Sequence, residues 1–194
     1  MVNLKDQLAL DKYGGLYKTH FWGADLGLSY LKNSEMELMG TEFEANLFDT
    51  GIEVRSEVGY FDDQSLGRRY LKGIIGADYA FPEMITILGE YFYNGIGAVD
   101  AANYDADIIT TYNWNLARHY LAASISYVYN PLASFSLVGI SNLVDGSFYT
   151  GLTYSYSLSD ESTLALGCVM FDGDDDTEFS SYATSYYLKL GYYF

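Results

Sequence analysis

The chain ends in Ser181-Tyr-Ala-Thr-Ser-Tyr-Tyr-Leu-Lys-Leu-Gly-Tyr-Tyr-Phe194, and this stretch decides the fold. Counting back from the last residue in steps of two gives one set of aromatic and apolar side chains: Phe194, Tyr192, Leu190, Leu188, Tyr186, Thr184 and Tyr182. The residues between them are glycine, lysine, serine and alanine beside two tyrosines. Because successive side chains of a strand point to opposite faces, the stretch predicts a strand with one apolar face rimmed by tyrosines.

The apolar face continues to the final residue, which strands of soluble proteins seldom show. This pattern resembles the closing strand of Gram-negative outer-membrane β-barrel proteins, in which it is also the signal read by the assembly machinery. The resemblance is specific for residues 181–194. For the rest of the chain it is limited to the general pattern of alternating strands and linkers. It implies partners in the barrel assembly machinery, outer-membrane lipid and lipopolysaccharide, and a carboxyl-terminal assembly signal made of Tyr186, Leu188, Leu190, Tyr192 and Phe194.

The composition fits a membrane protein that crosses with strands. A length of 194 residues predicts a single domain spanning residues 1–194. The chain contains 21 tyrosines and 11 phenylalanines, far above the ordinary usage of these residues. No window approaches the roughly 18 uninterrupted apolar residues that a spanning helix requires. A soluble protein of this size would have too little core to hide so many aromatic side chains.

Charge and cysteine content exclude some classes of function. The formal net charge of -16 argues against a nucleic-acid partner, since contacts to phosphates need lysine and arginine. It suits a surface that handles cations or water. Cys168 is the single cysteine, which excludes an internal disulfide, and the alternation places it on the lipid face.

Alternation recurs in segments of about ten residues, joined by linkers that are alternately short and long. The predicted fold is therefore all-β, an antiparallel up-and-down transmembrane β-barrel with short periplasmic turns and longer extracellular loops. Barrels of this kind have an even number of strands, so we predict twelve strands if Asn3 to Leu10 pairs and ten if the first segments are loose. The other predicted strands are residues 13–21, 24–31, 39–47, 52–61, 70–81, 85–94, 116–129, 132–143, 148–158, 163–171 and 181–194.

Two interpretations of the chain's extent stay open. Met1 to Leu10 shows no signal-peptide pattern, so the sequence is either a mature form or a fragment of a longer product. The stretches Gly76-Ala77-Asp78-Tyr79 and Gly89-Glu-Tyr-Phe-Tyr-Asn-Gly95 resemble larger porin-type outer-membrane proteins. The chain would then be the carboxyl-terminal part of a larger barrel.

The alternation divides the predicted inward face into two walls. The second wall, from Leu116 onward, is small and smooth, with Arg118 and Lys189 as its charges. The first wall is rich in carboxylates, and we predict that it lines a pore through Glu42, Glu44, Glu53, Arg55, Glu57, Lys72, Asp78 and Glu90. Such a wall favours cations along a narrow water path. The alternative is that Glu53, Arg55 and Glu57 form a salt-bridge ladder that fills a small lumen.

Two connectors carry hypotheses of their own. Gly95 to Asn115 either folds into the lumen as a constriction or extends the neighbouring strands as a hairpin, and we favour the hairpin. The acidic run from Asp172 to Glu178 lacks the glycine and the final glutamate of an EF-hand loop, which favours a solvated acidic loop. We predict no metal site and no cofactor.

Catalysis finds little support. His20 and His119 are the only histidines, and neither is predicted to lie with a serine and a carboxylate at the outer rim. The predicted function is a porin-like passive channel for small hydrophilic or cationic solutes, and not an enzyme. The alternatives are a closed structural or adhesive outer-membrane barrel acting through its acidic loops, and a soluble β-barrel that carries an apolar ligand.

Overall fold

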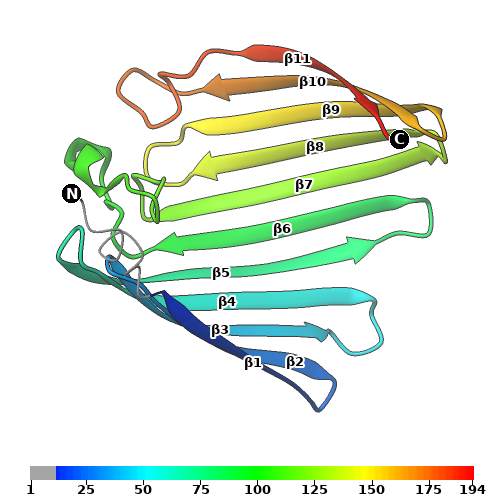
Figure 1. The fold of residues 1–194 in the computed structure, drawn as a ribbon. Helices are drawn as coiled ribbons and strands as arrows, with labels where there is room; N and C mark the ends of the chain where they lie inside the picture. The colour runs from blue at the N-terminus through cyan, green and yellow to red at the C-terminus, as the bar shows by residue number, and fades with distance from the viewer. Residues whose placement is uncertain (1–11) are drawn as a thin grey trace, which may run out of the picture.

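A computed structural model describes residues 12–194 and shows an all-β protein with eleven antiparallel strands in one sheet (Figure 1). Each strand pairs with the next strand of the sequence, and β1 and β11 form the two edges of the described sheet. The strands are β1 Tyr13–Phe21, β2 Ala24–Lys32, β3 Met36–Asn46, β4 Ile52–Asp63, β5 Arg68–Ala80, β6 Ile85–Asn94, β7 His119–Asn130, β8 Ala133–Asn142, β9 Phe148–Ser159, β10 Ser162–Asp172 and β11 Ser185–Tyr192. The twelfth strand predicted at Asn3 to Leu10 lies outside the described residues.

Connectors alternate between the two ends of the sheet, and the two longest, residues 95–118 and 173–184, lie at the same end, as the sequence predicts. We call one end the turn end, where residues 22–23, 47–51, 81–84, 131–132 and 160–161 join consecutive strands. The other is the loop end, formed by residues 33–35, 64–67, 95–118, 143–147 and 173–184. This arrangement confirms the predicted up-and-down topology.

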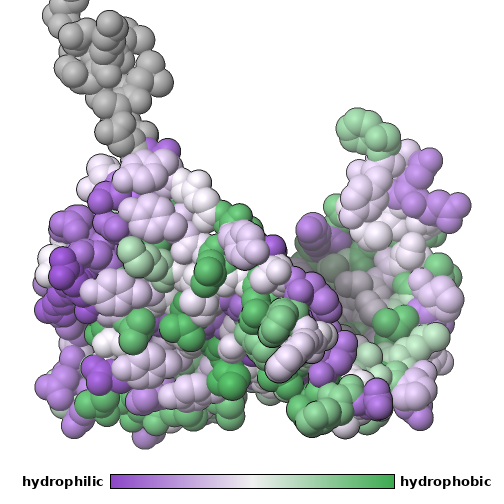
Figure 2. All heavy atoms as spheres, turned by 90° about the horizontal axis from the view of Figure 1, so that it is seen from below, coloured by the Kyte–Doolittle hydropathy of each residue, from purple (hydrophilic) through white to green (hydrophobic). Residues whose placement is uncertain are grey.

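The outer face of the sheet is apolar and uncovered. It carries Leu26, Phe43, Val58, Ile75, Leu121, Leu137, Leu152, Leu166 and Leu188, which the strand register places on one side. Ile75 is 55% exposed and Leu188 is 69% exposed. Figure 2 shows hydrophobic residues in green spread over the visible surface among hydrophilic ones, with a deep hollow between two raised parts. Apolar exposure on this scale is typical of a face packed against lipid.

The turn end displays large apolar side chains in an unusual backbone conformation. Trp22, Phe48 and Met84 have φ angles of 52°, 53° and 62°, in the left-handed region that glycine normally occupies. They lie in the turns after β1, β3 and β5, and they are 92%, 86% and 60% exposed. Such a conformation costs about 1 kcal/mol at each non-glycine residue. The sequence patterns give no sign of this feature.

Full burial is concentrated at the loop end. Met36, Tyr70, Ile108 and Tyr120 are at most 6% exposed. The buried polar residues also lie there: Asp63, Asn94, Asn113, Asn142 and Ser147. Ala133, at the turn end, is the one buried hydrophobic residue away from this region among residues 12–194. The small core of the described chain therefore forms between the strand ends and their connectors.

The closing strand is shorter than predicted. β11 contains Ser185–Tyr192, whereas residues 181–184 belong to the connector that precedes it. The ring of Tyr182 stacks on Phe171 with centroids 5.0 Å apart. The prediction that the strand begins at Ser181 is thus wrong, because the connector folds back onto β10 before β11 starts.

None of the helical segments described between residues 12 and 194 is long and apolar enough to cross a membrane.

Candidate functional site

The second face of the sheet, which we call the inner face, carries the charged side chains. It is the face contacted by residues 95–118, since Lys72 on β5 donates to the backbone oxygen of Tyr112 (2.6 Å). Strand register places every residue of the predicted pore lining on this side: Glu42, Glu44, Glu53, Arg55, Glu57, Lys72, Asp78 and Glu90. The role of these residues in a pore stays a prediction, whereas their shared face is a feature of the structure.

The charges form rows across β2 to β6. Glu44 lies opposite both Asp25 and Arg55, and Gly76 connects Arg55 to Glu90 in the same row. One row nearer the loop end, Glu42 and Glu57 lie directly opposite each other. Like charges in directly opposite positions destabilise a sheet, so the local arrangement favours a cationic group between or near them.

Some of these carboxylates have cationic partners. Arg55 pairs with Glu53 (N–O distance 3.2 Å) and with Asp78. The second partner of Arg55 is therefore Asp78 on the next strand, and not Glu57 as in the predicted ladder. Lys18 on β1 pairs with Glu42 (2.5 Å). These side chains are partly exposed, so water screens each pair and its contribution to stability is small.

Three carboxylates of the wall remain without an ion pair in residues 12–194: Glu44, Glu57 and Glu90. They lie on three different strands, β3, β4 and β6. The inner face of β2 to β6 thus keeps a net negative charge after its pairs are formed.

The inner face of β7 to β11 is nearly free of charge in the described chain. Many of its side chains are small, as predicted, but Tyr149, Phe171 and Tyr187 lie on the same face. The small residues are Ala122, Ser124, Ser126, Gly151, Thr153, Ser155, Ser157, Ala165, Gly167 and Ser185. Lys189 is the cation of this wall within β11. Arg118, the other predicted cation, precedes β7 and donates from Nε to the backbone oxygen of Gly97 (3.0 Å).

Glycines allow side chains to cross a whole strand at both edges of the sheet. Lys18 on β1 reaches Glu42 on β3 across Gly27, where an added Cβ would clash with Glu42. At the other edge, the hydroxyl of Tyr187 on β11 hydrogen-bonds Thr153 on β9 (2.7 Å) across Gly167. Each edge strand is therefore tied to its second neighbour as well as to its first.

Residues 95–118 do not form the predicted hairpin. They contain two single 3-10 turns, η1 Ala101–Asn103 and η2 Ala106–Ile108, and Ile108 is 2% exposed. The side chain of Asp100 caps η1 and that of Asp105 caps η2, each by accepting a backbone N–H. These Asx caps stop the segment from continuing the ladder of β6, so the hairpin prediction is wrong.

The same segment bridges the two halves of the sheet. On one side, Asn33 donates to the hydroxyl of Tyr112 (3.0 Å), and Lys72 donates to the backbone oxygen of Tyr112. On the other side, the N–H of Leu116 donates to Glu178 (2.9 Å) and the hydroxyl of Tyr104 donates to Asp145 (2.8 Å). Residues 95–118 therefore contact the inner face at the loop end, which is the placement expected of a constriction.

A network of buried and partly buried polar groups ties three connectors together. The carboxylate of Glu178 accepts from the hydroxyl of Tyr120 (2.5 Å) and from the amide of Asn142 (2.7 Å). Asp145 accepts from Asn142 (3.0 Å), from the Glu178 N–H (2.8 Å) and from Ser147. We call this set of Tyr104, Tyr120, Asn142, Asp145 and Glu178 the loop latch.

The two carboxyl groups of the loop latch respond differently to their surroundings. Burial raises the pKa of Glu178, and the hydrogen bonds from Tyr120 and Leu116 only partly offset this effect. Burial also acts to raise the pKa of Asp145, but hydrogen bonds from the Glu178 N–H, Ser147 and Tyr104 outweigh it and lower that pKa. Burial, reinforced by Asp145, raises the pKa of the Tyr104 hydroxyl. Glu178 is thus not part of a solvated acidic loop, as the sequence predicts for residues 172–178.

The histidines occupy separate places. His20 lies on the inner face near the turn end and hydrogen-bonds Asp25 (2.7 Å). His119 lies on the outer face at the loop end and hydrogen-bonds the hydroxyl of Tyr91 (2.6 Å). No group of three or more histidine, cysteine, aspartate or glutamate residues suited to a metal ion occurs between residues 12 and 194.

Comparison with known proteins reveals similarity at the level of fold. No family model and no curated protein matches the chain. A solved structure that matches is BamA from Haemophilus ducreyi lacking POTRA domains 1–3, with a TM-score of 0.51 and 13% sequence identity. The match covers 86% of this chain and 42% of that chain, so this chain spans less than half the length of that structure. At this identity the likeness establishes the fold alone, an antiparallel up-and-down sheet of the β-barrel type.

Proposed function

We propose that the chain is a porin-like passive channel for small hydrophilic or cationic solutes in the outer membrane of a Gram-negative bacterium, and that it is not an enzyme. The observation that carries the proposal is the inner position of Glu44, Glu57 and Glu90, which have no ion-pair partner in the described chain. Carboxylates along a water path lower the energy of a cation and raise that of an anion.

The apolar outer face supports the membrane location. On β11, this face carries Tyr186, Leu188, Leu190 and Tyr192, all more than 60% exposed, and Phe194 follows the strand. We assign these five residues the role of assembly signal, read by the barrel assembly machinery. Lipid and lipopolysaccharide then surround the exposed apolar surface.

Single-channel recording of the refolded protein in a planar bilayer tests the channel. Under a salt gradient, the wild type should show steady openings and a reversal potential of cation-selective sign. Replacing Glu44, Glu57 and Glu90 together by glutamine should abolish most of the cation preference. A matched control replaces Glu35, Glu83 and Glu161, which lie in connectors, and should leave the selectivity unchanged.

Two outcomes would count against the proposal. A folded and inserted protein that never conducts contradicts a channel, and unchanged selectivity in the triple variant contradicts the role of the three carboxylates. A protein that stays monodisperse without detergent would instead favour a soluble carrier of an apolar ligand.

The loop latch favours a second candidate, a closed structural or adhesive barrel that acts through its connectors. Hydrogen bonds that hold residues 95–118, 143–147 and 173–184 in one arrangement would present a fixed external surface. This candidate requires no conductance, and it requires loss of binding to a surface partner when residues 95–115 or 172–178 are removed.

A further inference from the structure

A pocket opens on the inner face where two glycines lie opposite each other. Gly40 on β3 pairs with Gly59 on β4, so no side chain rises from this position on either strand. The resulting cavity measures about 270 Å³. Toward the loop end it is bounded by Leu38 and Phe61, and toward the turn end by Glu42 and Glu57. The pocket is therefore apolar on one side and acidic on the other.

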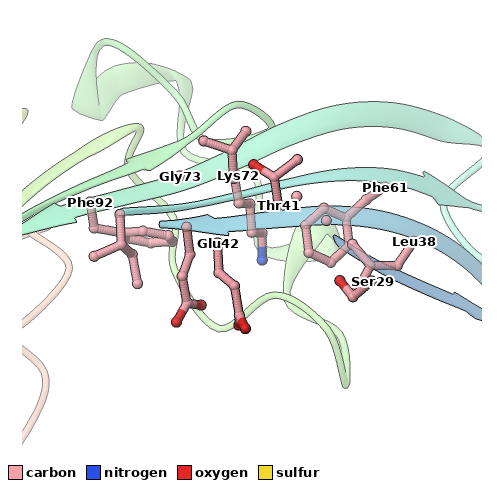
Figure 3. Close-up of a pocket in the computed structure, with 13 residues that line it drawn as sticks. Ser29, Leu38, Thr41, Glu42, Phe61, Lys72, Gly73 and Phe92 are labelled. Carbon is pink, nitrogen blue, oxygen red and sulfur yellow. The ribbon is translucent and has the colours of Figure 1, made fainter. Parts of the chain in front are cut away.

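The side chains of the pocket project from the sheet in the arrangement that the register requires. Figure 3 shows Glu42 and Lys72 on the same side of the sheet, with Phe92 and Phe61 toward opposite ends of the pocket and Thr41 projecting to the other side. An added Cβ at Gly59 would lie 2.7 Å from the Phe61 ring and 3.0 Å from Leu38. Glycine at position 59 thus allows the side chains of Phe61 and Leu38 to lie over the backbone of β4.

Lys72 and Glu57 are opposite charges on neighbouring strands that do not pair. Lys72 lies opposite Gly59, and Glu57 lies opposite Ile74, so the two residues are diagonal neighbours. Diagonal positions on a sheet are within reach of long side chains. The ammonium group of Lys72 is held away, because it donates to the backbone oxygen of Tyr112 (2.6 Å) and lies 5.4 Å and 5.6 Å from the ring centroids of Phe61 and Tyr70.

Both charged groups keep binding capacity. An ammonium group has three donors, and the structure gives that of Lys72 one acceptor. Glu57 is exposed and has neither an ion pair nor a side-chain hydrogen bond within residues 12–194. Glu42 already pairs with Lys18. The pocket therefore offers one free carboxylate and one partly satisfied ammonium group on either side of an apolar space.

We propose that this pocket binds a small zwitterion of the amino-acid class, with its ammonium group at Glu57, its carboxylate at Lys72 and its carbon chain against Leu38 and Phe61. A simple cation would meet Lys72 without compensation, and a simple anion would meet Glu42 and Glu57. A zwitterion satisfies both ends and stays neutral overall. The binding site deepens the proposed channel function, on which its consequence for transport rests.

The experiment uses three matched probes and the refolded protein in detergent micelles. L-leucine carries both charges, isoamylamine lacks the carboxylate, and 4-methylpentanoate lacks the ammonium group. Titration followed by saturation-transfer NMR or calorimetry should show that each singly charged probe binds about tenfold more weakly or worse, since each loses one charge-assisted contact.

Two variants locate the site. Glu57→Gln should weaken leucine binding about tenfold and should not weaken 4-methylpentanoate, from which it removes a like charge. Lys72→Met should likewise weaken leucine and should not weaken isoamylamine. Glu44→Gln is the matched control, because Glu44 shares the inner face but does not line the pocket. Since Lys72 also anchors residues 95–118, amide exchange of that segment is measured in the same variant. Within residues 12–194 the Glu57 side chain makes no hydrogen bond or ion pair to a connector, so its variant carries the test independently.

Equal affinity for the three probes, or equal loss of leucine binding in Glu57→Gln and Glu44→Gln, would overturn the assignment. The outcome is separable from that of the channel. Leucine binding by a protein that never conducts would support the binding pocket and contradict the channel. Cation-selective openings without leucine binding would support the channel and contradict the binding pocket.

Discussion

The two halves of the inner face hold their charged and polar groups in different ways. From β1 to β6 the face is held by side-chain ion pairs within the sheet, such as Lys18–Glu42 and Arg55–Glu53. From β7 to β11 the inner side chains of the strands are nearly all uncharged, and the carboxylates of the loop latch, Glu178 and Asp145, come from connectors. Ion pairs that stay partly hydrated leave room for water and solutes, whereas a buried polar network fixes the groups that form it. The charged half is the one to which we assign the proposed binding and conduction, and the other half holds the connectors of the loop end.

Of the changes considered, breaking the loop latch should have the largest effect on stability, and that effect should be confined to the half formed by β7 to β11 and its connectors. Replacing Glu178 by alanine leaves the Tyr120 hydroxyl and the Leu116 N–H without their acceptor. The Asn142 amide loses one acceptor and keeps Asp145 and Tyr104. We expect a loss of about 3 kcal/mol in the local stability of the connectors, measured by amide hydrogen exchange of residues 95–118 and 173–184. The backbone amides of β1 to β6 should keep their protection from exchange.

Asp175→Ala provides the control, since it removes an exposed carboxylate from the same connector. If both variants exchange alike, the latch does not hold the connectors.

The glycines at the two sheet edges allow a sharper comparison of the halves. Alanine at Gly167 would press on the ring of Tyr187, and alanine at Gly27 would press on the flexible side chain of Glu42. Because the ring can yield less easily, we expect a loss of about 2 kcal/mol for Gly167→Ala and about 1 kcal/mol for Gly27→Ala in the free energy of unfolding.

Denaturant unfolding in micelles measures both changes. Gly89→Ala is the reference, since an added Cβ there meets nothing within 4 Å. Equal losses in all three variants would mean that the crossings do not stabilise the edges.

The smallest expected effect is the pH dependence of the latch. The pKa of Glu178 is raised by burial above its ordinary 4.5, so burial disfavours its ionised form and protonation relieves that cost. The pKa of Asp145 is lowered below its ordinary 3.8, so its contribution is present above that value and is lost as the pH falls through the lowered pKa. Protection of residues 173–184 should therefore rise slightly as the pH falls from 7 toward 4.5 and then fall below 3.8.

Glu178→Gln should remove the rise and keep the fall. A rise of the same size in this variant would assign the pH dependence to another group.

Alternation along the chain was sufficient to predict the topology, because each strand pairs with its sequence neighbour and side-chain direction follows from a period of two. For the same reason it placed Glu42, Glu57 and Lys72 on one face. It could not predict that Glu178 pairs with Tyr120, which is 58 residues away, or that Asp78 is a partner of Arg55. Those contacts depend on where connectors fold and on which diagonal neighbour a side chain reaches. No local pattern records either.

The caps of η1 and η2 correspond to a local signal in the sequence. Asp100 and Asp105 each precede a short turn and accept an N–H two residues later. Aspartates at that spacing favour local turns over a ladder. They argue against a hairpin at residues 95–118 even though Ile109, Tyr112 and Trp114 make the segment look like strand.

The bridge formed by residues 95–118 also constrains the order of assembly. Its contacts join residues that are 79 positions apart at Asn33–Tyr112 and 62 apart at Leu116–Glu178. Contacts between distant parts of a chain form late, because the entropy of closing long loops is lost before they are gained. The segment is thus accessible to proteases until both β2 and the connector before β11 are in place. Its resistance to cleavage reports that the sheet has been completed.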